Sequence, residues 1–396
     1  MKILYIAPYP PLKSGVADYS YYFKKAIEKN LNIQMDILDI YQNENIYTLR
    51  KFSSLGKKVK SLNIESYDLA HFEIGNGQNR EFYILYFIQK FFPNLKTIVT
   101  LHDPPQVLTA PMKFIGLENR FRIIRGIRKL FDITIGRYWI EKVMKKVGII
   151  ITLTEKGREE VIKKFSRDPS KTIYVPLLTH LNSLELSNSV VYKDKVEKIV
   201  FFGYFGSKKG IDILLKAFAI LLKSNVEYRN IKLYITGGLP VNSKADSFYK
   251  YVTRLIEQLG IKDSVIFTGW IPENEKEQLL KEADIVVLPY RKQATFGASA
   301  VLIQAMSYGV PIIISNTKSF SSEVEDGKTG LIFEDGNVKM LADKIKLMIE
   351  NKELRQQLGK NAREHIFKEH SWEYVASKMS KIYKKMLEEN FNENND

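Results

Sequence analysis

The stretch Lys198-Ile-Val-Phe-Phe-Gly203-Tyr-Phe-Gly-Ser-Lys-Lys209-Gly210 joins a short apolar run to a glycine-containing turn and then to a segment of helical period. The run Lys198–Phe202 predicts a buried strand, and a helix is expected from Lys209. Backbone N–H groups at a helix start, with a lysine beside them, favour an anion such as a phosphate. The alternative is a surface turn with two solvated lysines.

The same alternation of short apolar runs and helical segments extends through the chain on both sides, which is typical of parallel α/β sheets. In the first half it predicts strands at Lys2–Ala7, Ile33–Leu38, Leu69–Phe72, Thr97–Leu101 and Gly148–Leu153, and helices at Val16–Glu28, Arg80–Phe91, Asn119–Lys146 and Glu155–Phe165. In the second half it predicts further strands at Lys232–Thr236, Val265–Thr268, Ile285–Pro289 and Pro311–Ile314, and helices at Ser247–Leu259, at Asn274–Ala283 and from Ala298. Helices are expected to fill the rest of the chain to about Glu389.

The chain length also predicts two domains, because 396 residues exceed what one hydrophobic core usually organises. We expect a first doubly wound domain at 1–180, a connection at 181–196 where the periodicity is lost, and a second domain at 197–370. A last helix and a polar tail occupy 371–396. Two such domains facing each other would bind a ligand at the carboxyl ends of their strands.

Several chemistries are excluded by what the sequence lacks. It has no cysteine, which rules out disulfides, thiolate nucleophiles and Cys-ligated metal sites. The turn after the first strand lacks the Gly-x-Gly-x-x-Gly pattern of dinucleotide enzymes, and Ser322 stands where a Walker loop before Lys328 needs glycine. The five histidines form no His-x-x-x-His pair, so no catalytic metal is expected.

No run approaches the length of a membrane span, and the N-terminal apolar run stops at the prolines within Pro8–Pro11. A cytoplasmic protein is therefore expected, at most peripheral to a membrane. The net charge of +15 is uneven: residues 1–180 hold 29 Lys and Arg against 17 Asp and Glu, and 181–396 hold 31 against 28. This distribution predicts an anionic partner for the first half.

Residues 113–146 contain ten of those cations, interleaved with aromatic and aliphatic side chains. One interpretation is a cationic amphipathic helix on an anionic membrane surface, which would suit a lipid-linked acceptor. The other is a helix packed on the sheet with a solvated basic face. A nucleic-acid partner is supported by charge alone, and no recognition motif accompanies it.

A second candidate anion site lies in the stretch Phe296-Gly297-Ala298-Ser299-Ala300-Val301, which opens a helix after the strand ending in Pro289. Small residues there permit a phosphate to approach the helix N-terminus closely. Tight packing of the helix on the sheet would favour the same residues.

An ordered series of motifs over nearly the whole chain resembles the retaining glycosyltransferases of family 4, which have the two-domain GT-B fold. The motifs are Ser14–Ser20, Asp68–His71, Leu101–Asp103, Gly203–Gly210, Ile235–Gly238, Phe267–Pro272, Ala283–Tyr290, Gln304–Pro311 and Gly327–Phe333. Ser371-Trp372 and the helix after it are similar to the family's C-terminal helix, which crosses back to the first domain.

By this resemblance the second domain binds a nucleotide sugar and the first domain binds the acceptor. Lys209 and Gly203 would lie at the diphosphate, with Gly15 allowing its approach, and Gly297, Ala298 and Ser299 would donate N–H groups to it. Trp270 and Ile271 would contact the base and Gln304 the ribose, and Gly237 would belong to the donor-side loops. His102 would contact the donor sugar, with Asp103 near the acceptor.

The family's pair of glutamates, separated by seven residues, aligns here with Phe296 and Gln304, neither of which is acidic. Tyr204 stands where the family tends to have an arginine, and Arg291 is a candidate for the missing cation. The resemblance implies metal-independent transfer of a hexose from a nucleotide sugar, with retention, to a sugar, glycan or lipid-linked acceptor. The alternative is a catalytically silent nucleotide-sugar-binding homologue.

Overall fold

The computed structural model describes residues 1–12, 14–38, 49–75, 80–104, 136–181, 192–203, 205–238, 243–291, 297–317, 320 and 322–388. The chain divides into two compact units. Unit 1 comprises Met1–His180, Thr295–Ala298 and Trp372–Asp396, and unit 2 comprises Leu181–Ala294 and Ser299–Ser371.

Unit 1 is built on a six-stranded sheet of order β2-β1-β3-β4-β5-β6, in which every neighbouring pair is parallel. Its strands are β1 (Lys2–Ile6), β2 (Gln34–Ile37), β3 (Leu69–Ile74), β4 (Lys96–Leu101), β5 (Ile149–Thr152) and β6 (Thr172–Tyr174). All six residues of β3 are buried, as expected of a central strand covered on both faces.

The helices of unit 1 are α1 (Gly15–Asn30), α2 (Leu49–Lys60), α3 (Arg80–Phe91), α5 (Arg137–Lys145), α6 (Glu155–Phe165) and α14 (Trp372–Glu388), with the short 3₁₀ turn η4 (Pro169–Lys171). Side-chain caps fix two of the starts: Ser14 Oγ accepts from the Ala17 N–H, and Thr154 Oγ1 accepts from the Gly157 N–H.

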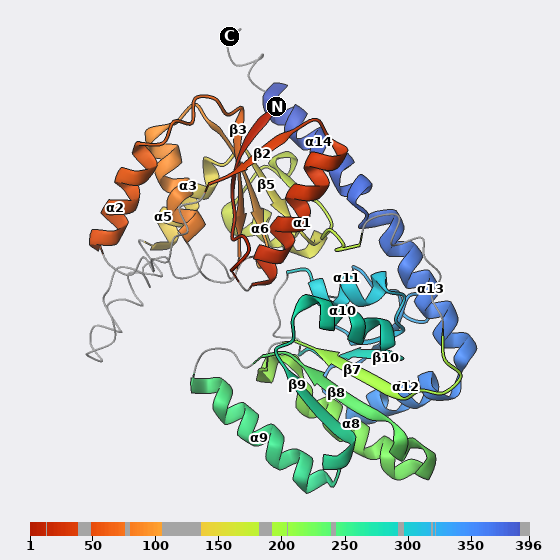
Figure 1. Ribbon diagram of the computed structural model, residues 1–396. Helices are drawn as coiled ribbons and strands as arrows, with labels where there is room; N and C mark the ends of the chain where they lie inside the picture. The colour runs from red at the N-terminus through yellow and green to blue at the C-terminus, as the bar shows by residue number, and fades with distance from the viewer. Residues whose placement is uncertain are drawn as a thin grey trace. The chain divides into compact units, whose positions relative to one another are not determined.

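Helix α14, from the end of the chain, is part of unit 1, where it packs beside α1 (Figure 1). Trp372 Nε1 donates to the Thr179 carbonyl at 3.0 Å, and the Tyr383 hydroxyl is hydrogen-bonded to His71 Nδ1 at 2.8 Å. Trp372 and Tyr383 are both buried. The C-terminal helix therefore completes the core of the first unit.

Unit 2 has a second six-stranded parallel sheet, of order β12-β11-β10-β7-β8-β9. Its strands are β7 (Lys198–Phe202), β8 (Lys232–Thr236), β9 (Val265–Gly269), β10 (Ile285–Leu288), β11 (Ile312–Ser315) and β12 (Leu331–Phe333). The change of direction at the first strand, β7, between β8 and β10 creates the switch point where doubly wound sheets bind ligands.

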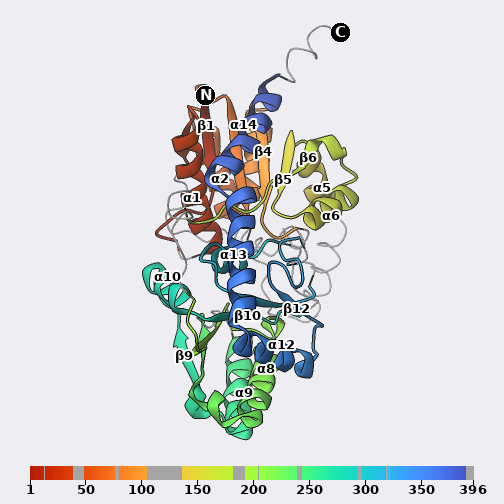
Figure 2. The ribbon, with the colours of Figure 1, turned by 90° about the vertical axis from the view of Figure 1, so that its right-hand side faces the viewer.

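The helices of unit 2 are α8 (Ile211–Ser224), α9 (Ser243–Leu259), α10 (Glu273–Glu282), α11 (Ala300–Ser307), α12 (Val338–Glu350) and α13 (Lys352–Glu369), with 3₁₀ turns η5 (Ser207–Lys209), η6 (Val226–Asn230) and η7 (Lys262–Ser264). Helices α8 and α12 lie side by side (Figures 1 and 2). The described end of the expected connection packs on this unit, where Tyr192 donates its hydroxyl to the Gly309 carbonyl at 3.0 Å.

The predicted α/β architecture is confirmed, and β7 and β8 have the predicted bounds. The prediction that helices alone follow the strand at Pro311–Ile314 is wrong, because β12 adds an edge strand beside β11. Two other elements, α2 and β6, were not predicted. β6 and β12 have three residues each, too few to show a period along the sequence.

The basic segment 113–146 is described only from 136 onward, and its remainder lies outside the described residues. In the described part, Ile140, Val143 and Met144 of α5 are buried in the core of unit 1. Trp139 stacks against Tyr83 with ring centroids 5.8 Å apart. This part of the segment therefore packs on the sheet. Among the described helices, none combines the length and apolarity needed to cross a bilayer.

Candidate functional site

A cluster of buried polar side chains lies at the carboxyl ends of β3 and β4 in unit 1. The Glu73 carboxyl group, which has no solvent exposure, is hydrogen-bonded to His102 Nε2 at 2.8 Å and to the Tyr5 hydroxyl at 3.0 Å. Parallel pairing places Glu73 opposite Thr100, so that His102 follows immediately beyond the end of β4. The sheet register therefore brings an acidic group and an imidazole together from residues 29 positions apart.

His71 belongs to the same cluster, but its two ring nitrogens are engaged within the core. Nδ1 is hydrogen-bonded to the Tyr383 hydroxyl and Nε2 to Thr100 Oγ1, each at 2.8 Å. Burial lowers the pKa of His71 to about 4, although the nearby Glu73 acts in the opposite direction. A neutral imidazole with two partners inside the core has a structural role, and the predicted site residue His102 is the more exposed of the two.

Three buried tyrosines surround this cluster. Burial, reinforced by the neighbouring Glu73, raises the pKa values of Tyr5, Tyr19 and Tyr383 well above the ordinary value for a phenol. The Tyr19 ring meets the His102 ring edge-on, with centroids 4.9 Å apart. Neutral hydroxyls and aromatic walls therefore fix the orientation of His102.

The predicted residues Gly297 and Asp103 also meet in unit 1. A β-carbon added to Gly297 would lie 2.3 Å from the His102 carbonyl oxygen and 2.6 Å from Asp103 Oδ1, which leaves no room for a side chain. Ala298 follows, half-buried, in the same segment. Gly15 starts α1 at an exposed position where an added β-carbon would meet nothing within 4 Å, so a ligand can approach its backbone.

In unit 2 the turn between β7 and α8 contains two positions whose backbone conformation, with positive φ, favours glycine. Gly203 has φ +156° and Gly210 has φ +68°, and a β-carbon on Gly210 would lie 1.8 Å from the Pro289 carbonyl oxygen. Between them Lys209 places its Nζ 3.7 Å from the centroid of the Tyr290 ring. This cation–π contact holds the lysine of the predicted anion site in a defined position.

Arg291 lies against the same turn, but as a structural clamp. Its guanidinium makes a salt bridge to Asp212 at 2.7 Å and donates to the Ser207 carbonyl at 3.2 Å. Its backbone N–H also donates to the Lys208 carbonyl at 3.0 Å. The cation expected to compensate for Tyr204 is therefore engaged with the turn itself.

The carboxyl ends of the neighbouring strands β7, β8 and β9 are linked by backbone hydrogen bonds. The N–H of Gly203 donates to the Thr236 carbonyl at 3.0 Å, and that of Gly237 donates to the Gly269 carbonyl at 2.9 Å. Trp270 follows directly and is 54% exposed, while Ile271 is half-buried. An exposed indole on a rigid strand end is suited to stack on a planar ring.

Gln304, predicted to reach a ribose, is buried, with 2% of its surface exposed. Its side-chain Nε2 donates to Glu273 Oε1 at 2.7 Å, and Lys276 binds the other oxygen of Glu273 at 2.5 Å. Ser299 caps α11, accepting from the Leu302 N–H at 3.3 Å. The amide of Gln304 thus orients a carboxyl group from α10.

Sequence reasoning missed two acidic residues, Glu73 and Glu273. Glu73 lies two positions after His71, on the same face of a strand whose other residues are apolar, and that pattern is a usable signal. Glu273 gave no such signal, because it stands among four acidic residues between positions 273 and 282. Its contact with Gln304 spans 31 positions and depends on packing alone.

Comparison with known proteins shows which family the second unit resembles. Residues 183–365 match the profile described as Glycosyl transferases group 1, a range that covers most of unit 2. An uncharacterised glycosyltransferase of Methanocaldococcus jannaschii is 25% identical over 249 residues, which make up 60% of this chain and 60% of that protein. The chain thus matches less than two thirds of that relative's length.

Solved structures show the same architecture over nearly the whole chain. A glycosyltransferase from Rickettsia africae has a TM-score of 0.69 at 16% identity, with 98% of each chain covered. The Anabaena protein HepE, in a complex with UDP-glucose, has a TM-score of 0.69 at 14% identity, covering 97% of this chain and 100% of that one. The chain has the GT-B fold of two Rossmann-like units, and its residues 183–365 are similar to the glycosyl transferases of group 1.

Proposed function

We propose that the protein transfers a hexose from a nucleoside-diphosphate sugar to a hydroxyl group of a sugar, glycan or lipid-linked acceptor. The observation that carries the proposal is the position of Lys209, held over Tyr290 in a glycine turn at the carboxyl end of β7. A fixed cation at a sheet switch point stabilises the negative charge that develops on a leaving diphosphate. The similarity of this unit to glycosyl transferases of group 1 supports the same chemistry.

Within unit 2, the residues predicted to bind the donor nucleotide sugar have distinct roles in this proposal. Trp270 offers an exposed ring to the base, and the backbone at Gly203 lies beside the diphosphate. The transfer needs no metal, because Lys209 and the N-terminus of α11 at Ser299 provide the positive potential. In unit 1, His102 contacts the transferred sugar, and Asp103 the acceptor.

Glu273 extends this assignment. By the resemblance to family 4, position 304 carries an amide where that family has its second glutamate, and this amide is hydrogen-bonded to Glu273. We infer that the Glu273 carboxyl group accepts hydrogen bonds from the ribose hydroxyls and that Gln304 holds this carboxyl group in position. Replacing Glu273 by Gln should therefore remove the preference for the bound ribonucleotide over its 2′-deoxy analogue, whereas Glu275→Gln, on the same helix α10, should keep it.

The direct test is thermal unfolding with UDP-, GDP- and ADP-sugars. A ligand present at about 100 times its dissociation constant adds about 2.7 kcal/mol of stability, a shift that is readily measured. We expect one nucleotide class to stabilise the protein, Lys209→Ala to abolish the shift, and Lys208→Ala to retain it. Equal shifts in both lysine variants would refute the role of Lys209, and no shift with any sugar nucleotide would refute donor binding.

A second test separates binding from transfer. Glu73 is a positioning residue for His102, so Glu73→Gln should leave the nucleotide-induced shift unchanged. The transfer rate should fall by about 10²-fold, because the His102 imidazole can then reorient and no longer contacts the sugar in the required geometry. The pH dependence of the transfer rate should change as well. A variant with normal kcat and an unaltered profile would show that Glu73 only stabilises the fold.

A further inference from the structure

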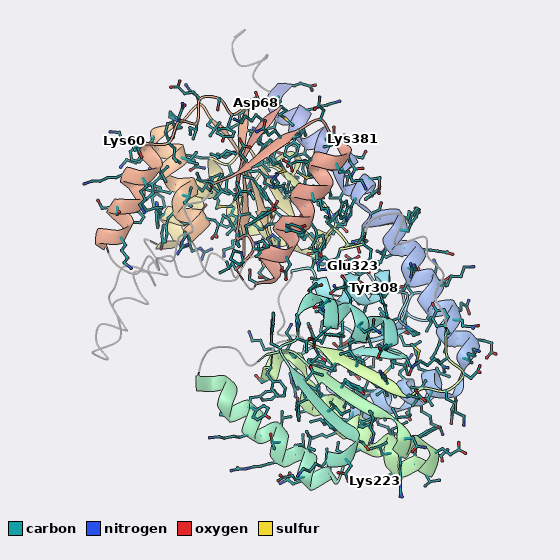
Figure 3. All side chains as sticks on the ribbon, viewed as in Figure 1. Lys60, Asp68, Lys223, Tyr308, Glu323 and Lys381 are labelled. Carbon is teal, nitrogen blue, oxygen red and sulfur yellow. The ribbon has the colours of Figure 1, made fainter. Side chains whose placement is uncertain are left out.

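We propose that Glu323, His365 and His370 of unit 2 form a binding site for a divalent transition-metal ion, and that Zn²⁺ is the ion which this donor set fits best. None of these three residues is among the nucleotide residues described above. Glu323 lies in the loop between β11 and β12, His365 lies in the last turns of α13, and His370 ends that helix. Figure 3 labels Glu323.

The three ligand atoms converge. His370 Nε2 is 2.9 Å and His365 Nε2 is 3.6 Å from the same carboxyl oxygen, Oε2 of Glu323. One donor atom from each of the three residues can be chosen so that all three lie within 4.8 Å of one another. Zinc bonds of about 2.0–2.1 Å in a tetrahedron separate neighbouring ligands by about 3.3 Å, so the observed spacings bracket the required one. Small side-chain rotations would admit the ion.

The chemistry of the donors also suits a cation. Glu323 and His370 are almost fully buried, with 4% and 1% of their surfaces exposed. Two histidines and one carboxylate are an established donor set for zinc.

The surroundings of the carboxylate resemble the second shell of a metal ligand. The Ser322 hydroxyl donates to Glu323 Oε1 at 3.0 Å, which directs the other oxygen, Oε2, toward the imidazoles. His365 is partly exposed, with 23% of its side-chain surface accessible. It therefore provides an entry path and room for water as a fourth ligand.

An ion at this site would fasten the loop after β11 to the end of α13. That helix ends at Glu369, two residues before Ser371, the last residue of unit 2. The metal would thus have a structural role at the end of this unit. The sequence did not indicate it, because 42 positions separate Glu323 from His365 and the two histidines are five positions apart.

The same contacts would also arise if a protonated imidazole simply formed an ion pair with Glu323, and metal analysis distinguishes the two. The untagged full-length chain is stripped with EDTA, incubated with ZnCl₂, desalted and analysed for bound zinc. We expect about one equivalent in the wild type, and below about 0.1 equivalent in His365→Ala and Glu323→Gln. His180→Ala, which removes a histidine of unit 1, should keep the full equivalent.

Two further measurements make the result specific. Co²⁺ should give visible absorption bands of a low-symmetry N/O site, and these should be lost in His365→Ala. Ser322→Ala should keep the stoichiometry and weaken zinc affinity by about tenfold. The proposal is overturned if the wild type binds no zinc, or if all variants bind it equally. If Glu323→Gln fails to fold, the partly exposed His365→Ala decides the outcome alone.

Discussion

Acid should weaken unit 1 through a single buried histidine, His71. Its imidazole has no solvent exposure and is hydrogen-bonded to Tyr383 and Thr100, and burial lowers its pKa to about 4. In the unfolded chain a histidine titrates near 6.5. Between these two values the unfolded state binds more protons than the folded state. The free energy of unfolding must therefore fall as the pH is lowered through this window.

The size of the effect follows from the two pKa values. The full difference between the two pKa values corresponds to about 3 kcal/mol, all of it present above pH 6.5 and all of it lost below pH 4. Between pH 7.5 and pH 5.0 the linkage relation gives a loss of about 2 kcal/mol. That is a large share of the stability of a typical domain.

Tryptophan fluorescence can isolate unit 1 in this experiment. The chain has three tryptophans, and in a Trp270→Phe background only Trp139 and Trp372, both in unit 1, remain. Urea unfolding is measured at both pH values in this background and again with His71→Gln added. Glutamine retains a donor and an acceptor but does not titrate. We expect the variant to lose about 2 kcal/mol less than its parent between the two pH values.

The control is His180→Gln, because His180 stacks on Tyr22 with ring centroids 4.5 Å apart and is only half-buried. This variant should show the parental pH dependence. If His71→Gln also keeps it, the acid sensitivity of unit 1 has another origin and the argument from burial fails.

Two further substitutions probe packing in the two units. Gly210→Ala should destabilise unit 2 by at least about 3 kcal/mol, since φ is +68° and the new β-carbon would overlap the Pro289 carbonyl. The control is Gly206→Ala, where an added β-carbon meets nothing within 4 Å, so the midpoint of urea unfolding should change little. Equal effects of the two substitutions would refute the steric argument. Trp372→Phe removes the donor to the buried Thr179 carbonyl and should cost unit 1 about 1–3 kcal/mol, whereas an unchanged unfolding curve would show that this bond contributes nothing.

The elements that sequence periodicity predicted correctly are those with strong local patterns. Lys198–Phe202 is a continuous apolar run and Arg80–Phe91 has a helical period, and both have the predicted bounds. The two strands that were not predicted, β6 and β12, are short and lie at sheet edges, and the 12-residue helix α2 was not predicted either. The strand β12 has three residues, one of them half-buried, and becomes a strand only because β11 offers a partner beside it.

The sequence by itself determined the α/β architecture, because alternating apolar runs and amphipathic segments can bury their faces only in covered parallel sheets. It also indicated the turn at Lys209, since a strand, a glycine turn and a helix start are adjacent along the chain. Tertiary structure alone decided which side chains meet. Glu73 with His102, Gln304 with Glu273, and Glu323 with His370 are brought together by sheet register and helix packing across 29 to 47 positions, distances over which local sequence carries no information.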